Sequence, residues 1–308
     1  MKSKGMETGI MNKSRIRLRR ERMKDKVTTV GDIAKIIESI APAGLQEEWD
    51  NSGLLIGFED RQVSKVLTCL EINMDVVEEA ISKGAEMIIS HHPLIFGGIS
   101  SLNADTPKGA VIIRLIRHGI SVYSSHTPFD KAPGGNNDAL AGVLGLKDVT
   151  VLDGSKVPSA EDMISKPSQM HIGRIGKLKK PLRFSQVIDL VCDELRLNPS
   201  MIIAAGNLDR VISKIGLCTG AGAEFTEAAA QQGCEAFITG DVKYHQAQDA
   251  REMGICLIDA GHYGTEKIFP AVMKIQLEKV LEKDVVVTAS EIDLDPFLAL
   301  AGAYSITD

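Results

Sequence analysis

The fold class is most evident in residues 63–92, VSKVLTCLEINMDVVEEAISKGAEMIISHH. Residues 63–72 and 85–90 are short runs rich in apolar side chains, which predict buried strands. Residues 74–84 carry apolar side chains at helical spacing and end on a glycine, the residue typical of a helix C-terminus. Strand, helix and strand in this order predict a βαβ unit with parallel strands.

The same alternation continues on both sides of this stretch. Thr29 is placed to cap a helix VGDIAKIIES, in which Val30, Ile33 and Ile37 recur at helical spacing. After the loop HHPLIFGGIS we expect a helix PKGAVIIRLIRHG and a strand ISVYSS. The pattern therefore predicts an α/β fold with a largely parallel sheet, whose functional loops follow the C-terminal ends of the strands.

The second half of the chain repeats the first. Residues 78–92 align with residues 226–241 over a helix, a glycine and a strand, and residues 119–130 resemble residues 254–266. Both members of the second match end with a histidine followed four positions later by a carboxylate. These pairs are His126/Asp130 and His262/Glu266. The repetition predicts two related α/β halves, with a ligand site at their interface.

Length and composition limit the function classes. The 308 residues suggest about two domains, and we place the first half at residues 28–150 and the second at residues 151–308. A net charge of −6 and an aromatic content of 4% argue against a general nucleic-acid binder. No apolar run is long enough for a membrane span. The five cysteines lack CxxC spacing and fit reduced core thiols in the cytoplasm, where we expect the protein.

The N-terminal segment stands apart by charge. Residues 1–26 hold ten Lys/Arg and three Asp/Glu, so the rest of the chain is strongly acidic. A nucleic-acid arm or an organelle address is possible for such a segment, but no apolar region follows it as in a secretory signal. We interpret residues 1–27 as a basic, disordered tail.

His91 and His92 follow the apolar strand AEMIIS directly. Adjacent residues on an extended backbone point to opposite sides. The two histidines are therefore better placed to give one nitrogen to each of two metal ions than to chelate a single ion. The alternative is a pair of hydrogen-bonded core histidines.

Further candidate ligands come from the repeated histidine–carboxylate pairs. If a helix starts near Gly261, His262 and Glu266 lie on one helical face, as chelation requires, although an ordinary surface pair has the same spacing. Asp130 is a ligand candidate or a turn residue. Three histidines and two carboxylates suit two ions of Zn, Fe, Mn or Co, with Glu266 as the bridge.

Four more residues are candidates for supporting roles, each with a purely structural role as the alternative. His126 and His245 are candidates for proton transfer, and Asp50 and Asn51 could reach the site. Other mechanisms lack their motifs: the chain has no GxSxG or GxGxxG sequence. HIGRIGKLKK, residues 171–180, lacks the phosphate-loop spacing and is expected to be a basic loop, which could attract an anionic substrate.

Five ordered motifs resemble those of the GTP cyclohydrolase I type 2 homologues, also called Ngg-interacting-factor-three-like proteins. They are WDNSGLLIG, ISHHPLIF, SSHTPFDKAPGGNND, ITGDVKYHQAQDA and DAGHYGTEK, and the resemblance covers about residues 28–300. It implies a dinuclear metal site between two α/β domains and a ring-shaped homohexamer. The family's metal ligands fall on His91, His92, Asp130, His262 and Glu266, and its supporting histidine falls on His126.

The chain departs from the family pattern in two places. It reads HTPFD at residues 126–130 where the family commonly reads HTNLD, and the basic tail lies outside the family pattern. It also resembles the short form of the family, without an inserted domain between the halves. We expect a metal-dependent hydrolase of a small nucleotide-like substrate. The family name implies a cyclohydrolase, and a phosphoester hydrolase is chemically just as compatible with a two-metal site. The alternative is a non-enzymatic metal-binding ring or scaffold for partner proteins, and a nucleic-acid regulator has only the basic tail in its favour.

Overall fold

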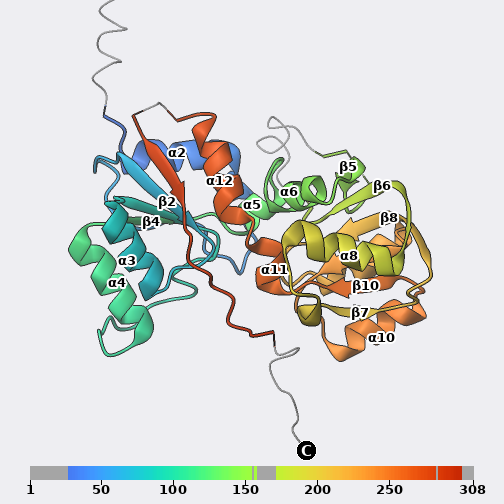
Figure 1. Cartoon of the computed structure of the whole chain (residues 1–308). Helices are drawn as coiled ribbons and strands as arrows, with labels where there is room; N and C mark the ends of the chain where they lie inside the picture. The colour runs from blue at the N-terminus through green and yellow to red at the C-terminus, as the bar shows by residue number, and fades with distance from the viewer. Residues whose placement is uncertain (1–26, 155, 158–170, 282–283, 300–308) are drawn as a thin grey trace, which may run out of the picture.

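The computed structural model describes residues 27–154, 156–157, 171–281 and 284–299 (Figure 1). The basic segment 1–26 lies outside these residues, so its interpretation stays a prediction. Two α/β units, each a sheet with its helices, lie side by side in Figure 1, with short helices between them. Within the described residues, no helix is long and apolar enough to cross a membrane.

The first sheet has the strand order β1-β4-β3-β2-β11. Its strands are β1 Gly53–Ile56, β2 Lys65–Cys69, β3 Met87–Ser90, β4 Ser121–Ser124 and β11 Val286–Ala289. Strand β1 is antiparallel to β4, and the other neighbours pair in parallel. The predicted βαβ unit and the largely parallel sheet are confirmed for this half.

Helices cover both faces of the first sheet. They are α2 Val30–Ile40, α3 Met74–Lys83, α4 Pro107–His118 and α12 Phe269–Glu278. Apolar residues of α2 and α12 pack with one face of the strands, and those of α3 and α4 pack with the other. Thr29 caps α2 through reciprocal hydrogen bonds with Asp32, as its sequence position predicts. Helix α3 ends at Gly84, whose φ of +66° suits a residue without a Cβ.

The second sheet has the order β5-β6-β8-β9-β10-β7. Its strands are β5 Lys147–Val151, β6 Arg174–Arg183, β7 Ile203–Ala205, β8 Val211–Leu217, β9 Ala236–Thr239 and β10 Cys256–Asp259. Only β8, β9 and β10 pair in parallel; β5, β6 and β7 pair antiparallel. The expectation of a largely parallel sheet is therefore wrong for this half.

Strand β6 also corrects the expected basic loop at residues 171–180. Its lysines and Pro181 hide the strand pattern, because proline cannot donate to a ladder and charged residues are uncommon in strands. The pairing register between β6 and β8 shifts between Lys177 and Leu182, which accommodates Pro181 in the strand.

The helices of the second half follow the same scheme as those of the first. They and the short helices at the boundary are α5 Thr127–Lys131, α6 Asn136–Val143, α8 Phe184–Leu195, α9 Thr226–Gln231, α10 Tyr244–Glu252 and α11 His262–Glu266. The order β2-α3-β3-α4-β4-α5 matches β8-α9-β9-α10-β10-α11, and β1 and β7 add antiparallel to β4 and β10. This correspondence agrees with the internal repeat of the sequence.

Each sheet and its core contain residues from both sides of the predicted boundary near residue 150. Apolar residues of α6 and the loop before β5 pack in the core of the second sheet. Helix α12 and strand β11, from the C-terminal part of the chain, complete the first sheet and its core. The division at residue 150 stays a prediction about folding units, and the chain crosses between the sheets twice.

A buried arginine links the two sides at the first crossing. Arg174 of β6 is fully buried, and its Nε donates to Asp138 Oδ1 of α6 at 2.5 Å. Its Nη2 donates to the carbonyl oxygen of Lys131 in α5 at 3.0 Å, and its Nη1 donates to the carbonyl oxygen of Gly173 at 2.8 Å. One guanidinium therefore fixes α5, α6 and β6 relative to one another.

Arg174→Met is expected to lower the free energy of unfolding by about 3–5 kcal/mol, because Asp138 and several carbonyl groups lose their buried donor. Denaturant titration measures the change. Lys177→Met, in the same strand but 61% exposed, is the control and should stay within about 0.5 kcal/mol. Equal effects of the two substitutions would contradict the assigned role of Arg174.

Candidate metal centre

His91 and His92 lie directly after β3, which ends at Ser90. The chain bends here, so the two rings lie 5.2 Å apart between centroids instead of on opposite sides of an extended strand. His91 is fully buried, and its Nδ1 lies 3.0 Å from the carbonyl oxygen of Ser125. That contact leaves Nε2 of His91 directed to the carboxylates described next.

Helix α11 brings His262 and Glu266 to the same place from the second half. It begins after Gly261, whose φ is +78°, and the predicted i,i+4 pair lies on its one turn. Glu266 Oε2 lies 3.1 Å from His262 Nε2 and 2.9 Å from His92 Nε2. In Figure 1, α11 lies between the two halves. This position explains how His92 and Glu266, which are 174 positions apart in the chain, come into contact.

Asp130 of α5 completes the group. His91 Nε2 lies 3.6 Å from Asp130 Oδ1 and 3.6 Å from Glu266 Oε1. Both carboxylates are almost fully buried. The structure therefore brings all five sequence-predicted ligands, His91, His92, Asp130, His262 and Glu266, into one cluster.

The cluster divides into groups that could each hold a metal ion. One is His91, Asp130 and Glu266, and another is His92, His262 and Glu266; a third joins His126 to His91 and His92. Within each group the potential ligand atoms lie within 4.8 Å of one another. Imidazole and carboxylate ligands suit Zn, Fe, Mn or Co. His262 Nε2 is buried without hydrogen-bond geometry to any partner, although Glu266 lies near it, and a metal ion would satisfy this nitrogen.

Electrostatics within the cluster are dominated by burial and by opposite charges. Burial opposes protonation of His91, but Asp130 and Glu266 outweigh it and raise the pKa of His91 to about 9. The contact with Glu266 raises the pKa of His262 to about 9 as well. Burial raises the pKa of Asp130, whereas the three histidines around Glu266 overcome its burial and hold its pKa well below the usual range. Glu266 is thus kept as a carboxylate.

His126 is oriented by a buried carboxylate. Its Nδ1 lies 2.8 Å from Asp50 Oδ1, and Thr127 Oγ1 donates to Asp50 Oδ2 at 2.5 Å. These contacts outweigh burial and keep the pKa of Asp50 below its ordinary value. An Asp50–His126 hydrogen bond leaves Nε2 of His126 free to accept a proton. Asp50 thus reaches the cluster through His126, whereas the side-chain amide of Asn51 bonds the carbonyl oxygen of Ile95.

His245, the second candidate for proton transfer, is not brought into these groups. It is exposed on α10, and its ring lies 5.3 Å from that of Tyr244. Asp241, in the same motif as His245, is the residue that lies next to the cluster. Its Oδ2 lies 2.8 Å from Nδ1 of His262. The internal repeat could have identified Asp241 as a site residue. Asp241 stands two residues after β9, and His92 stands at the corresponding position, two residues after β3.

Polar residues at the start of α6 and in the loop after β8 support the carboxylates, and they are not among the residues predicted from the sequence. The Asn136 side chain donates to Asp130 Oδ1 at 3.0 Å, and Thr219 Oγ1 lies 3.4 Å from the same oxygen. The backbone amide of Gly220 donates to Thr265 Oγ1 in α11 at 2.9 Å. The loop after β8 therefore holds α5 and α11 in place together.

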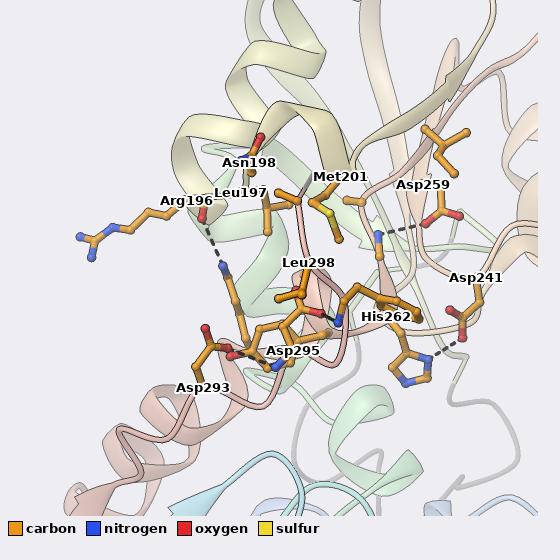
Figure 2. A pocket seen from close by; sticks show the side chains of 18 residues that line it. Arg196, Leu197, Asn198, Met201, Asp241, Asp259, His262, Asp293, Asp295 and Leu298 are labelled. Atoms are coloured by element: carbon orange, nitrogen blue, oxygen red, sulfur yellow. Dashed lines mark hydrogen bonds and ion pairs between the residues drawn. The ribbon is translucent and has the colours of Figure 1, made fainter. Parts of the chain in front are cut away.

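A cavity of about 550 Å³ adjoins the cluster on the side of His262 (Figure 2). Figure 2 shows the His262–Asp241 pair on one side of the view and Arg196 and Asp293 on the other. The polar lining of the cavity also includes Lys267 and Asp295. The volume falls in the range of small-molecule sites.

The family model of Duf34/NIF3 (NGG1p interacting factor 3) matches residues 28–296. The chain belongs to this family. A Clostridium perfringens relative with the name GTP cyclohydrolase 1 type 2 homolog is 37% identical over 271 residues, which cover 87% of this chain and 98% of that protein. The relative of the same name from Clostridium acetobutylicum is 35% identical over 271 residues, 87% of this chain and 97% of that protein.

Two solved structures have the same fold as this chain. A Bacillus cereus protein related to NIF3 is 25% identical with a TM-score of 0.81, over 89% of this chain and 99% of that one. A hypothetical protein of Staphylococcus aureus is 31% identical with a TM-score of 0.77, over the same shares of the two chains. The predicted family membership is therefore confirmed.

Proposed function

We propose that this protein binds two divalent metal ions at the interface of its halves and hydrolyses a nucleotide-like substrate. The observation that carries the proposal is the position of Glu266. One of its carboxylate oxygens faces His91, and the other faces His92 and His262. A carboxylate between two sets of ligands would serve both ions of a two-metal site.

When bound, such a pair of ions supplies an activated water and a Lewis acid for the attacked bond. The chain supplies the ligands and the proton path. Asp50 holds His126 in the orientation that lets its free nitrogen accept a proton from the attacking water and return it to the leaving group. Asp241 orients His262 in the same manner from the second half.

The nucleotide-like substrate is inferred from the name of the relatives, GTP cyclohydrolase 1 type 2 homolog. The cavity beside His262 has room for part of such a molecule. Both ring opening of a purine and cleavage of a phosphoester use an activated water, so either reaction agrees with the site.

His126→Asn is expected to lower kcat on the order of 10²–10⁴-fold, the usual contribution of general acid–base catalysis, while metal content stays unchanged. Elemental analysis and initial-rate kinetics on the same preparation separate the two quantities. Loss of metal along with activity would instead make His126 a ligand, as its group with His91 and His92 allows. His245→Ala, measured alongside, decides whether the second candidate takes part.

The proposed activity is tested by incubation of the metal-loaded protein with nucleotides. Formate release indicates ring opening, and phosphate release indicates phosphoester hydrolysis. Turnover that follows metal content and disappears with a chelator supports the hydrolase. Metal binding and release without any turnover would favour the non-enzymatic metal-binding ring or scaffold.

We also propose that the chain assembles into a homohexamer, as the family resemblance implies. Light scattering should give a mass six times that of the 33.2 kDa chain. A monomeric mass at micromolar concentration would exclude this assembly.

A further inference from the structure

Two exposed aromatic rings lie beside the candidate metal centre. Trp49 is the single tryptophan of the chain and is 61% exposed, and Phe96 is 53% exposed. Their ring centroids are 6.2 Å apart, and the rings are inclined at 50°. Trp49 also meets the His126 ring edge-on at 5.8 Å, and His126 lies 5.7 Å from the His92 ring. One histidine ring therefore separates the aromatic pair from the metal ligands.

Both rings lie on loops that a partly buried network of hydrogen bonds holds together. Asp50, next to Trp49, is buried and binds the side chains of His126 and Thr127. The side-chain amide of Asn51 donates to the carbonyl oxygen of Ile95, the residue before Phe96, at 2.6 Å. This bond ties the two loops to each other, and Asp50 ties them to His126. The rings are thus exposed but held in position beside the cluster, and small-molecule sites are lined largely by apolar and aromatic side chains.

We propose that Trp49 and Phe96 form a stacking platform for the heteroaromatic ring of the substrate; this inference rests on the proposed function. A nucleotide-like molecule has a planar π-surface at one end and anionic groups at the other. Aromatic side chains bind the planar end by stacking, which tolerates any base because every base has a π-face. The histidine–carboxylate cluster lies one ring away for the reacting group.

The single tryptophan makes the platform directly observable. We expect GMP to quench the fluorescence of the metal-loaded full chain in a saturable manner. Ribose 5-phosphate has the same sugar and phosphate but no base, and it should leave the fluorescence unchanged. No saturable response to GMP, or an equal response to both compounds, would overturn the platform.

Phe96→Ala keeps Trp49 as the reporter and removes one half of the platform. Its affinity for GMP should fall by about tenfold, as the loss of a base-stacking ring implies, with metal content unchanged. Phe58→Ala is the matched control, because Phe58 is 74% exposed in the loop after β1 and should not affect the affinity. An unchanged GMP affinity of Phe96→Ala together with a smaller assembly mass would overturn the proposal and assign the pair to a contact between copies of the chain.

Different measurements would contradict the stacking platform and the proposed hydrolase activity. GMP binding that depends on Phe96, without turnover of any nucleotide, supports the platform and contradicts the hydrolase. Metal-dependent turnover that Trp49→Ala and Phe96→Ala leave unchanged in both KM and kcat supports the hydrolase and overturns the platform.

Discussion

Glu266→Gln is expected to reduce the metal content of both sites at once. The carboxamide keeps the size of the side chain but removes the negative charge that faces His91 on one side and His92 and His262 on the other. Each of the two ligand groups that contain Glu266 then keeps two of its three residues. Because the loss of a residue that merely supports a ligand costs 10–100-fold in affinity, we expect a loss of at least about 100-fold here.

Metal titration by calorimetry on the chelator-treated protein measures this change. Glu252→Gln, at the exposed end of α10, makes the same chemical change away from the cluster and should bind metal as the wild-type does. Retention of one ion at unchanged affinity would show that Glu266 serves a single site. Retention of both ions would contradict the bridging role.

Gly220→Ala is expected to disrupt the cluster without a change in any ligand. A Cβ at this position would overlap Glu266 Oε1 and lie 3.3 Å from His262 Nε2. Gly220 also has a φ of +68°, which costs an alanine about 1–2 kcal/mol. Steric displacement of Glu266 should therefore add a loss of metal affinity of at least about tenfold to the loss of stability.

Gly233→Ala separates these two effects. Gly233 has a similar φ of +74°, but a Cβ there would meet no atom within 4 Å. We expect both variants to lose thermal stability, Gly220→Ala at least as much as Gly233→Ala, and a loss of metal affinity only in Gly220→Ala. Equal metal affinities of the two variants would contradict the close packing of the β8 loop against Glu266.

The repeated pattern was sufficient to predict much of the site. His126/Asp130 and His262/Glu266 stand at corresponding ends of strands, and the structure places each pair at a short helix, α5 and α11. The i,i+4 spacing is a local property, so the sequence reports it directly. The same holds for the Thr29 cap and for the βαβ unit around α3.

Other features depend on contacts between distant segments, which no local pattern records. Thr219 and Gly220 lie in a loop of ordinary composition, and their importance comes from residues 130 and 266 that fold against them. The partner of Arg174 stands 36 positions away in the chain. The antiparallel strands of the second sheet were missed because β6 carries lysines and a proline on a strand that pairs on both sides.

The metal content of the chain is the most direct test of the two-metal site. Elemental analysis of untagged protein, purified without chelators, is predicted to find about two divalent ions per chain. Much less than one ion per chain, even after reconstitution with Zn, Mn or Fe, would contradict the two-metal site and leave the histidines as structural residues.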